Sequence, residues 1–141
     1  MSTERPGPYA GDITPQQAWQ LLSDNPDAVL VDVRTDAEWR FVGVPDLSRL
    51  GREAVFIEWN TSDGRLNANF TDELRDRVPD TEADRPVVFL CRSGNRSIGA
   101  AEAATRAGIT PAYNVLEGFE GHAAAAGESG WRAIGLPWKQ L

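Results

Sequence analysis

The only cysteine of the chain, Cys91, opens the segment CRSGNRS and directly follows the apolar run VVFL. A lone cysteine is more often inert packing than a catalyst. Its neighbours favour catalysis here, because Gly94 permits a tight concave loop and Arg92 and Arg96 place positive charge beside the sulfur. A helix that begins after the loop adds the positive end of its dipole. The segment therefore predicts a nucleophilic thiolate at Cys91.

Other catalytic chemistries find less support in the residue types. The one histidine, His122, lies in EGHAAAAG, and a loop of this kind needs no general base, so we assign His122 to the surface or to packing. A cysteine–histidine hydrolase is the weaker alternative. One cysteine and one histidine do not make a four-ligand metal site, and no glycine-rich nucleotide loop of the usual forms is present. We expect neither a metal nor a cofactor.

Length and charge set the class of protein. The 141 residues fit one domain, which we place at residues 12–141 after a flexible N-terminal segment at 1–11. The net charge of −7 argues against nucleic acid as a partner, so any anion must be attracted by local donors. The sequence contains no signal-peptide pattern and no apolar run of membrane-spanning length. We expect a cytoplasmic monomer with no membrane partner.

The elements that must position Cys91 follow from apolar runs and capping patterns. Short apolar runs are typical of strands that are buried on both faces, and we expect four of them at 28–31, 54–57, 87–90 and 112–116. Capping boxes and helical spacing predict helices at 14–22, from 35 with Trp39 and Phe41 inward, at 69–78, and at 97–107. The last helix carries small side chains that allow close approach to a sheet.

This alternation predicts a three-layer α/β domain with a mainly parallel sheet. Ligands bind outside the carboxyl ends of the strands in such sheets, which is where Asp32, Arg34 and Cys91 are expected to lie. Residues 43–53 have no clean period and are expected to form a loop, and residues 118–126 a further helix or turn. We expect the C-terminal segment to cross the domain, with Trp131 and Trp138 covering apolar surface.

Five segments together resemble the single-domain rhodanese sulfurtransferases. They occur in family order and cover most of residues 13–138: LVDVR at 30–34, TDAEW at 35–39, VVFLCRSGNRS at 87–97, NVLEGFEG at 114–121, and GLPW at 135–138. The resemblance implies a rhodanese fold with a five-stranded parallel sheet flanked by helices. It also implies a two-step transfer, in which Cys91 takes a sulfane sulfur from a donor, holds it as a persulfide, and passes it to a nucleophile.

The family pattern implies roles for the residues around Cys91. The donor is expected to be a small anion such as thiosulfate, and the acceptor cyanide or a thiol, including a protein thiol. The cradle for the sulfur and the anion is expected to comprise Arg92, Ser93, Gly94, Asn95 and Arg96. Arg92 and Arg96 can hold the departing sulfite. Asp32 and Arg34 are expected to brace the loop.

Two alternatives share this fold neighbourhood. A cysteine-dependent phosphatase of the dual-specificity cell-cycle type has five residues between its cysteine and arginine, whereas only four separate Cys91 from Arg96, so the loop is short for wrapping a phosphoryl group. A persulfide carrier or a protein-interaction module of the same fold needs closer consideration, because a carrier requires the same reactive cysteine. Residues 43–53 and 118–130 depart from the family pattern, and we expect both segments to border the active-site mouth.

Overall fold

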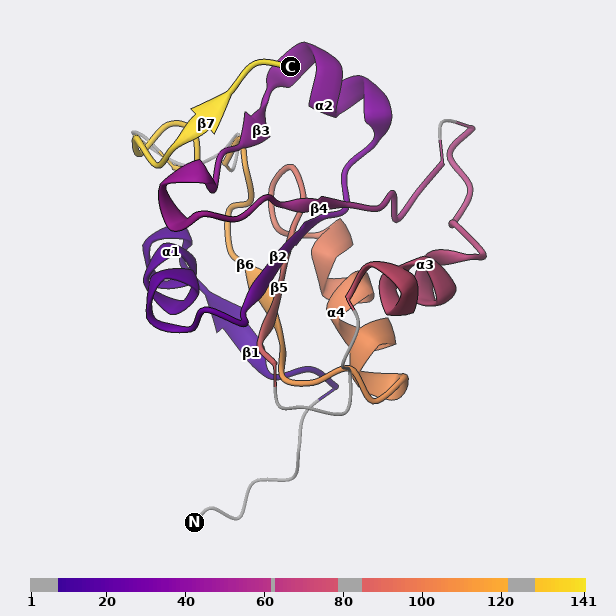
Figure 1. The fold of residues 1–141 in the computed structure, drawn as a ribbon. Helices are drawn as coiled ribbons and strands as arrows, with labels where there is room; N and C mark the ends of the chain where they lie inside the picture. The colour runs from indigo at the N-terminus through magenta and orange to yellow at the C-terminus, as the bar shows by residue number, and fades with distance from the viewer. Residues whose placement is uncertain (1–7, 62, 79–84, 122–128) are drawn as a thin grey trace.

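A five-stranded parallel sheet forms the centre of the computed structural model, which describes residues 8–61, 63–78, 85–121 and 129–141 (Figure 1). Its strands are β1 (Gly11–Ile13), β2 (Val29–Asp32), β4 (Val55–Phe56), β5 (Val87–Leu90) and β6 (Ala112–Val115). They lie in the order β1-β6-β5-β2-β4, and every neighbouring pair is parallel. The predicted α/β class with a mainly parallel five-stranded sheet is confirmed.

The helices begin where the capping patterns place them. Helix α1 (Pro15–Asp24) follows Thr14, and α2 (Asp36–Val42) follows Thr35, each with both hydrogen bonds of a capping box. Helix α3 spans Phe70–Arg77 and α4 spans Arg96–Arg106. These reciprocal bonds satisfy N–H groups that have no partner inside the helix. They need a threonine at the cap and a glutamine or glutamate three residues later, so the sequence alone predicted both helix starts. None of the described helices, of which the longest has 11 residues, is long and apolar enough to span a bilayer.

The pleat of the central strand β5 divides the core into two layers. Val87 and Phe89 pack into the cluster beneath α3 and α4. Val88 and Leu90 pack into the opposite cluster, beneath α1. Figure 1 shows the same arrangement, with α1 on one side of the sheet and α3 and α4 on the other. Because both faces are covered, the strand reads as an unbroken apolar run.

Strand β1 is absent from the sequence expectations. Gly11 belongs to the strand, although we expected residues 1–11 to be a flexible segment. The N–H of Ala10 also donates to the carbonyl of Ala112, at 2.8 Å. Three residues of mixed polarity give no periodic signal, and β1 is defined by its pairing with β6. Residues 1–7 of the predicted segment lie outside the described residues, so the structure shows only that its last residue, Gly11, belongs to β1.

A second, two-stranded sheet joins the segment 43–53, which we expected to be a loop, to the C-terminal segment. Strand β3 (Val44–Pro45) pairs antiparallel with β7 (Trp138–Lys139). The predicted packing of the C-terminal segment is confirmed for Trp131, which is fully buried and donates its indole N–H to the carbonyl of Pro137, at 2.7 Å. Trp138 remains partly exposed and meets the ring of Phe119 edge to face, with 6.3 Å between the ring centroids.

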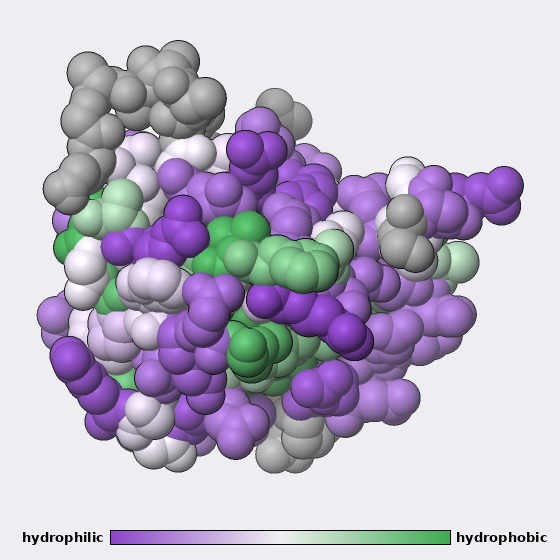
Figure 2. All heavy atoms as spheres, turned by 90° about the horizontal axis from the view of Figure 1, so that it is seen from above, coloured by the Kyte–Doolittle hydropathy of each residue, from purple (hydrophilic) through white to green (hydrophobic). Residues whose placement is uncertain are grey.

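The inward orientation predicted for Phe41 is wrong. Its side chain is 80% exposed, and α2 has no fully buried residue because it lies above the end of the sheet instead of against a face. Trp39 is half-buried and packs edge to face on Phe56, with 5.3 Å between the centroids. Figure 2 views the molecule from the side that carries α2 and β7, and shows apolar surface gathered in the middle of a hydrophilic face.

Candidate active site

Parallel pairing of β2 and β5 brings the two predicted site segments to one edge of the sheet. Asp32 is the register partner of Leu90, and the N–H of Val33 donates to the carbonyl of Leu90, at 2.8 Å. Cys91 follows directly, and the loop at residues 91–95 leads into α4. The two predicted site segments therefore lie together at the carboxyl ends of β2 and β5.

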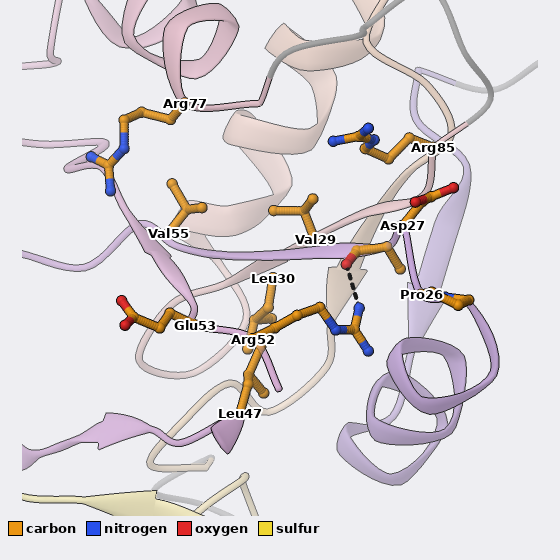
Figure 3. A pocket seen from close by; sticks show the side chains of 11 residues that line it. Pro26, Asp27, Val29, Leu30, Leu47, Arg52, Glu53, Val55, Arg77 and Arg85 are labelled. Carbon is orange, nitrogen blue, oxygen red and sulfur yellow. Dashed lines mark hydrogen bonds between the residues drawn. The ribbon is translucent and has the colours of Figure 1, made fainter. Parts of the chain in front are cut away.

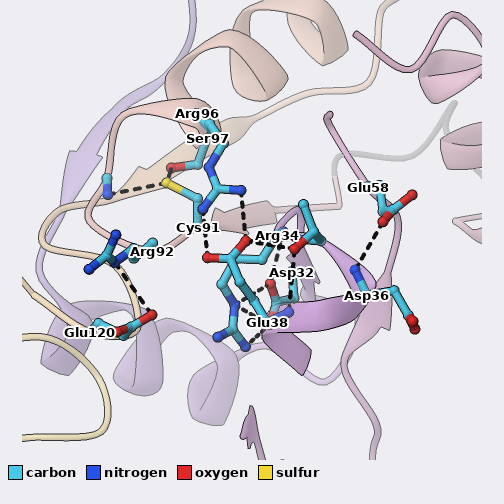
Figure 4. A network of polar contacts seen from close by, with 12 residues as sticks. Asp32, Arg34, Asp36, Glu38, Glu58, Cys91, Arg92, Arg96, Ser97 and Glu120 are labelled. Carbon is cyan, nitrogen blue, oxygen red and sulfur yellow. Dashed lines mark hydrogen bonds and ion pairs between the residues drawn. The ribbon is translucent and has the colours of Figure 1, made fainter. Parts of the chain in front are cut away.

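The sulfur of Cys91 receives polar contacts from its own loop and from the first turn of α4 (Figure 4). The N–H of Gly94 donates to Sγ at 3.2 Å, and Oγ of Ser97 also lies 3.2 Å from Sγ. The residue is only 1% exposed, and its other neighbours belong to the apolar cluster beneath α3 and α4. The sulfur thus lies where the core meets the loop, with two hydrogen-bond donors directed at it.

A buried amide continues this hydrogen-bond chain away from the sulfur. Ser97 Oγ is hydrogen-bonded to Oδ1 of Asn114 on β6. Both amide hydrogens of Asn114 are used, one towards Asp12 Oδ1 at 3.0 Å and one towards the carbonyl of Gly94 at 3.2 Å. Asn114 therefore ties β1, β6 and the loop to the hydroxyl that contacts the sulfur.

Arg96 does not point freely into the loop, because a carboxylate from α2 holds it. Its two terminal nitrogens donate to the two oxygens of Glu38, each at 2.9 Å. Burial raises the pKa of Glu38, but hydrogen bonds from Arg96 and Thr35 outweigh that effect and lower the pKa to about 2. The hydrogen bond to Glu38 raises the pKa of Arg96. This two-pronged pair is the geometry in which arginine binds a carboxylate most strongly.

Arg92 has a looser partner on the turn at residues 116–120. Its Nε lies 3.5 Å from Oε2 of Glu120, and its side chain is 64% exposed. The backbone of the same turn is bound to the loop, since the N–H of Phe119 donates to the carbonyl of Cys91 at 2.8 Å. Of the segment 118–130 that was predicted to border the active site, Phe119 and Glu120 contact the loop, and residues 122–128 lie outside the described residues.

Asp32 and Arg34 form a fully buried ion pair beneath the loop. Nη2 of Arg34 lies 2.6 Å from Asp32 Oδ2 and donates to the carbonyl of Gly43, at 2.8 Å. Nη1 of Arg34 is buried and makes no hydrogen bond, while the guanidinium lies 4.2 Å from the centroid of the Phe119 ring. The pair makes no direct bond to residues 91–96. Arg34 contacts the ring of Phe119, whose N–H donates to the carbonyl of Cys91.

Among the described residues, neither Ser93 nor Asn95 makes a side-chain hydrogen bond to the sulfur. Ser93 is half-buried, and Asn95 precedes α4 as its N-cap without a side-chain capping bond. Glu38, Ser97, Asn114 and Glu120 were missed as site residues. Glu38 carried a signal, the capping box, but that pattern explained the residue locally. Asn114 carried none, because its role depends on β6 lying between β1 and β5.

A pocket of about 240 Å³ lies at the other end of the sheet (Figure 3). Val29 and Val55, at the starts of β2 and β4, contribute to its wall. Arg52 crosses it to donate to the carbonyl of Ala28 at 2.7 Å and to that of Leu22, where it caps the end of α1. The pocket is thus separate from Cys91, and one of its three arginines, Arg52, supports the fold.

Two expectations concern other groups. His122 lies outside the described residues. Within the part of the chain that the structure describes, no three histidine, cysteine, aspartate or glutamate residues are grouped so as to hold a metal ion.

Comparisons with known proteins place these features in a family. A family model described as the STR4 middle domain matches residues 10–141. An uncharacterized protein of Rickettsia conorii is 38% identical over 128 residues, which are 91% of this chain and 96% of that protein. Thiosulfate sulfurtransferase GlpE of Glaesserella parasuis is 34% identical over 110 residues, covering 78% of this chain and 83% of GlpE.

Two solved structures are similar to this chain over most of its length. The crystal structure of Rv0390 from M. tuberculosis is similar with a TM-score of 0.87 and 73% identity, covering 94% of this chain and 99% of that one. The polysulfide-sulfur transferase homodimer from Wolinella succinogenes is similar with a TM-score of 0.61 and 23% identity, over 92% of this chain and 78% of the other. This second similarity concerns the fold alone.

Proposed function

Because the chain belongs to the rhodanese-like domain family, we propose that it is a sulfurtransferase that carries a sulfane sulfur on Cys91. The observation that carries the proposal is the environment of the sulfur. A cysteine that serves only as core filler needs no polar partner, yet Cys91 Sγ has the N–H of Gly94 and the hydroxyl of Ser97 at 3.2 Å each. Donors of this kind stabilise a negative charge on sulfur.

The proposed reaction has two sulfur-transfer steps. The Cys91 thiolate attacks the outer sulfur of the donor, a new S–S bond forms at Cys91, and the donor's own S–S bond breaks with its electron pair leaving on the donor fragment. An acceptor nucleophile, such as cyanide or a thiolate, then attacks the outer sulfur and releases the Cys91 thiolate. The loop donors hold the charge at each stage, because they are already fixed in place by the backbone and by Asn114.

A phosphatase is less well supported by this geometry. A transferred phosphoryl group needs a free arginine to bind its oxygens, whereas Arg96 is already bound to both oxygens of Glu38. The loop is also one residue shorter than the phosphatase pattern. A persulfide carrier is the second candidate, favoured by the 1% exposure of Cys91, because a buried cysteine is accessible to few adventitious thiols.

Mass spectrometry of the intact protein tests the proposal. After incubation with thiosulfate, or with a low-molecular-weight persulfide, the wild type is expected to gain one sulfur atom, which cyanide then removes. Cys91→Ser should gain none and should unfold at nearly the wild-type temperature, because only one atom changes. Ser23→Ala, which removes an exposed hydroxyl on α1, serves as the control and should still be loaded.

The outcomes separate the candidates. Sulfur that cyanide leaves in place but a protein thiol removes favours the carrier. A Cys91→Ser variant that still transfers sulfur, or Cys91-dependent release of phosphate from an aryl phosphate, would overturn the sulfurtransferase proposal.

A further inference from the structure

The two cations of the active loop are each paired with a carboxylate of the same chain. Arg96 is bound by Glu38 of α2, and Arg92 lies near Glu120 of the turn at residues 116–120. The two positive and two negative groups leave no net charge at the mouth. A small dianion that approaches Cys91 must therefore compete with a carboxylate for its arginine. Resting on the proposed function, we propose that Glu38 makes the site favour a persulfide of low charge, R–S–S–H, over thiosulfate as its sulfur donor.

Glu38 is fixed in position before any donor arrives. The N–H of Thr35 donates to Glu38 Oε1 at 3.0 Å, and the N–H of Glu38 donates to Thr35 Oγ1 at 3.3 Å. The capping box thus aims the carboxylate, and Figure 4 shows it reaching from α2 towards Arg96. Little side-chain entropy is lost when the pair forms, so the pair is stronger than an ordinary surface ion pair.

Partial burial makes the competition costly for an incoming anion. The side chains of Arg96 and Glu38 are 26% and 20% exposed, so water screens them only in part. Displacing the carboxylate would leave an ionised Glu38 half-buried without its cation. Arg92 cannot replace Arg96 fully, because its guanidinium is mostly exposed and its contribution is screened.

The two donor classes differ in the charge that they bring to the sulfur. Thiosulfate is a dianion. Transfer of its outer sulfur to the Cys91 thiolate breaks the S–S bond of thiosulfate, and sulfite, also a dianion, leaves with the electron pair. A protonated persulfide is neutral at its sulfurs. Its outer sulfur bonds to Cys91 with its proton, and the inner sulfur leaves with the electron pair as the thiolate RS⁻. The second reaction places one negative charge at the mouth, which the Gly94 N–H and the Ser97 hydroxyl can stabilise without Arg96.

The test compares two donors on the wild type and on Glu38→Gln. Glutamine keeps the capping box, because its oxygen can still accept from Thr35, and it removes the charge that holds Arg96. We expect the KM for thiosulfate to fall by roughly tenfold, the size expected for freeing a charged hydrogen-bond donor. The kcat/KM for the persulfide of 2-mercaptoethanol, which carries no charge on carbon, should change by less than about twofold on the same reasoning.

Asp36→Asn is the matched control. Asp36 lies on the same helix and pairs with Arg40 on the exposed side, away from the loop. The substitution removes one negative charge, as Glu38→Gln does. Its effect on thiosulfate should be much smaller. A KM for thiosulfate that is unchanged in Glu38→Gln, or that falls equally in Asp36→Asn, would overturn the inference, as would a wild type that prefers thiosulfate. If neither donor loads sulfur on wild-type Cys91, the proposed function itself fails.

Discussion

Ser97 has one hydroxyl proton and two acceptors within reach, Cys91 Sγ and Asn114 Oδ1. Asn114 cannot reverse this relation, because both of its amide hydrogens are used by Asp12 and by the carbonyl of Gly94. The hydroxyl can therefore donate to Asn114 while Cys91 is a thiol, and turn towards the sulfur when Cys91 is a thiolate or a persulfide. In the proposed mechanism we therefore expect Ser97 to act as a positioning residue whose proton can serve either acceptor.

Replacement of Ser97 by alanine should slow sulfur loading. A hydrogen bond to a charged acceptor contributes about 1.5–3 kcal/mol, so we expect persulfide formation from either donor to slow by at least roughly tenfold. The time course of sulfur addition, followed by intact mass, measures this effect. Ser23→Ala removes an exposed hydroxyl from α1, on the face of the sheet opposite α4, and should load at the wild-type rate. Equal rates in all three proteins would show that the Ser97 hydroxyl does not act on the sulfur.

Among the single residues of the site, the sequence identified the candidate nucleophile but not the side chains that surround it. Cys91 and the two loop arginines are close in sequence, and a tight loop keeps them close in space. Glu38 meets Arg96 across 58 positions, and Asn114 meets Ser97 across 17. Such contacts depend on strand order, which no local pattern encodes. The roles of Ser93 and Asn95 stay predictions.

The turn at residues 116–120 is the element that covers the loop. Gly118 has a φ of +57°, and a Cβ built there would clash with the carbonyl of Cys91 and lie 2.6 Å from the carbonyl carbon of Arg92. Those contacts are backbone atoms, which cannot rotate away. The close approach of turn and loop, with the Phe119 N–H on the Cys91 carbonyl, therefore requires glycine at this position.

Gly118→Ala is expected to damage both stability and sulfur transfer. The unfavourable φ and the overpacking should together cost about 2–4 kcal/mol of unfolding free energy, and the displaced loop should lower the sulfur-loading rate by about tenfold or more. Denaturant unfolding and the loading assay measure the two effects.

Gly108→Ala provides the control for strain alone, because Gly108 has a φ of +83° and open space around its Cβ direction. It should lose about 1 kcal/mol and keep its loading rate. A Gly118→Ala protein that behaves like Gly108→Ala would contradict the close packing of turn and loop.

The elements that could be predicted from sequence are those with several turns or several buried residues. Strands β2, β5 and β6 were found as apolar runs, and α1 and α2 by their capping boxes. The two-residue strands β3 and β7 were missed, because pairing across about ninety positions defines them and their side chains show no alternation. Phe41 was misplaced because a helix of seven residues above a sheet edge has no buried face.

Across the whole molecule, the Glu38–Arg96 pair joins α2, which lies above the end of the sheet, to α4, which covers one face of it. The carboxyl has a pKa of about 2 in the folded protein and an ordinary value of 4.5, so the folded state holds the Glu38 proton less tightly than the unfolded state does. The stability that it contributes is therefore complete above about pH 4.5 and is lost as the pH falls towards 2.

Acid titration of stability should reveal this contribution. Near pH 6 we expect Glu38→Gln to be less stable than the wild type by about 1–2 kcal/mol, a value reduced for partial exposure, and the difference should vanish as the pH approaches about 2. Urea unfolding at several pH values measures the difference, with Asp36→Asn again as the charge-matched control. A difference that is independent of pH would show that Arg96 does not keep Glu38 ionised.

The position of β6 between β1 and β5 has a consequence for how the chain is made. The first strand has no neighbour in the sheet until residues 112–115 have left the ribosome, so most of the polypeptide must exist before the sheet can close. Closing such a long loop is slow compared with forming the helices. We therefore expect the thiol of Cys91 to stay accessible on the nascent chain until β6 and the turn at residues 116–120 have been made.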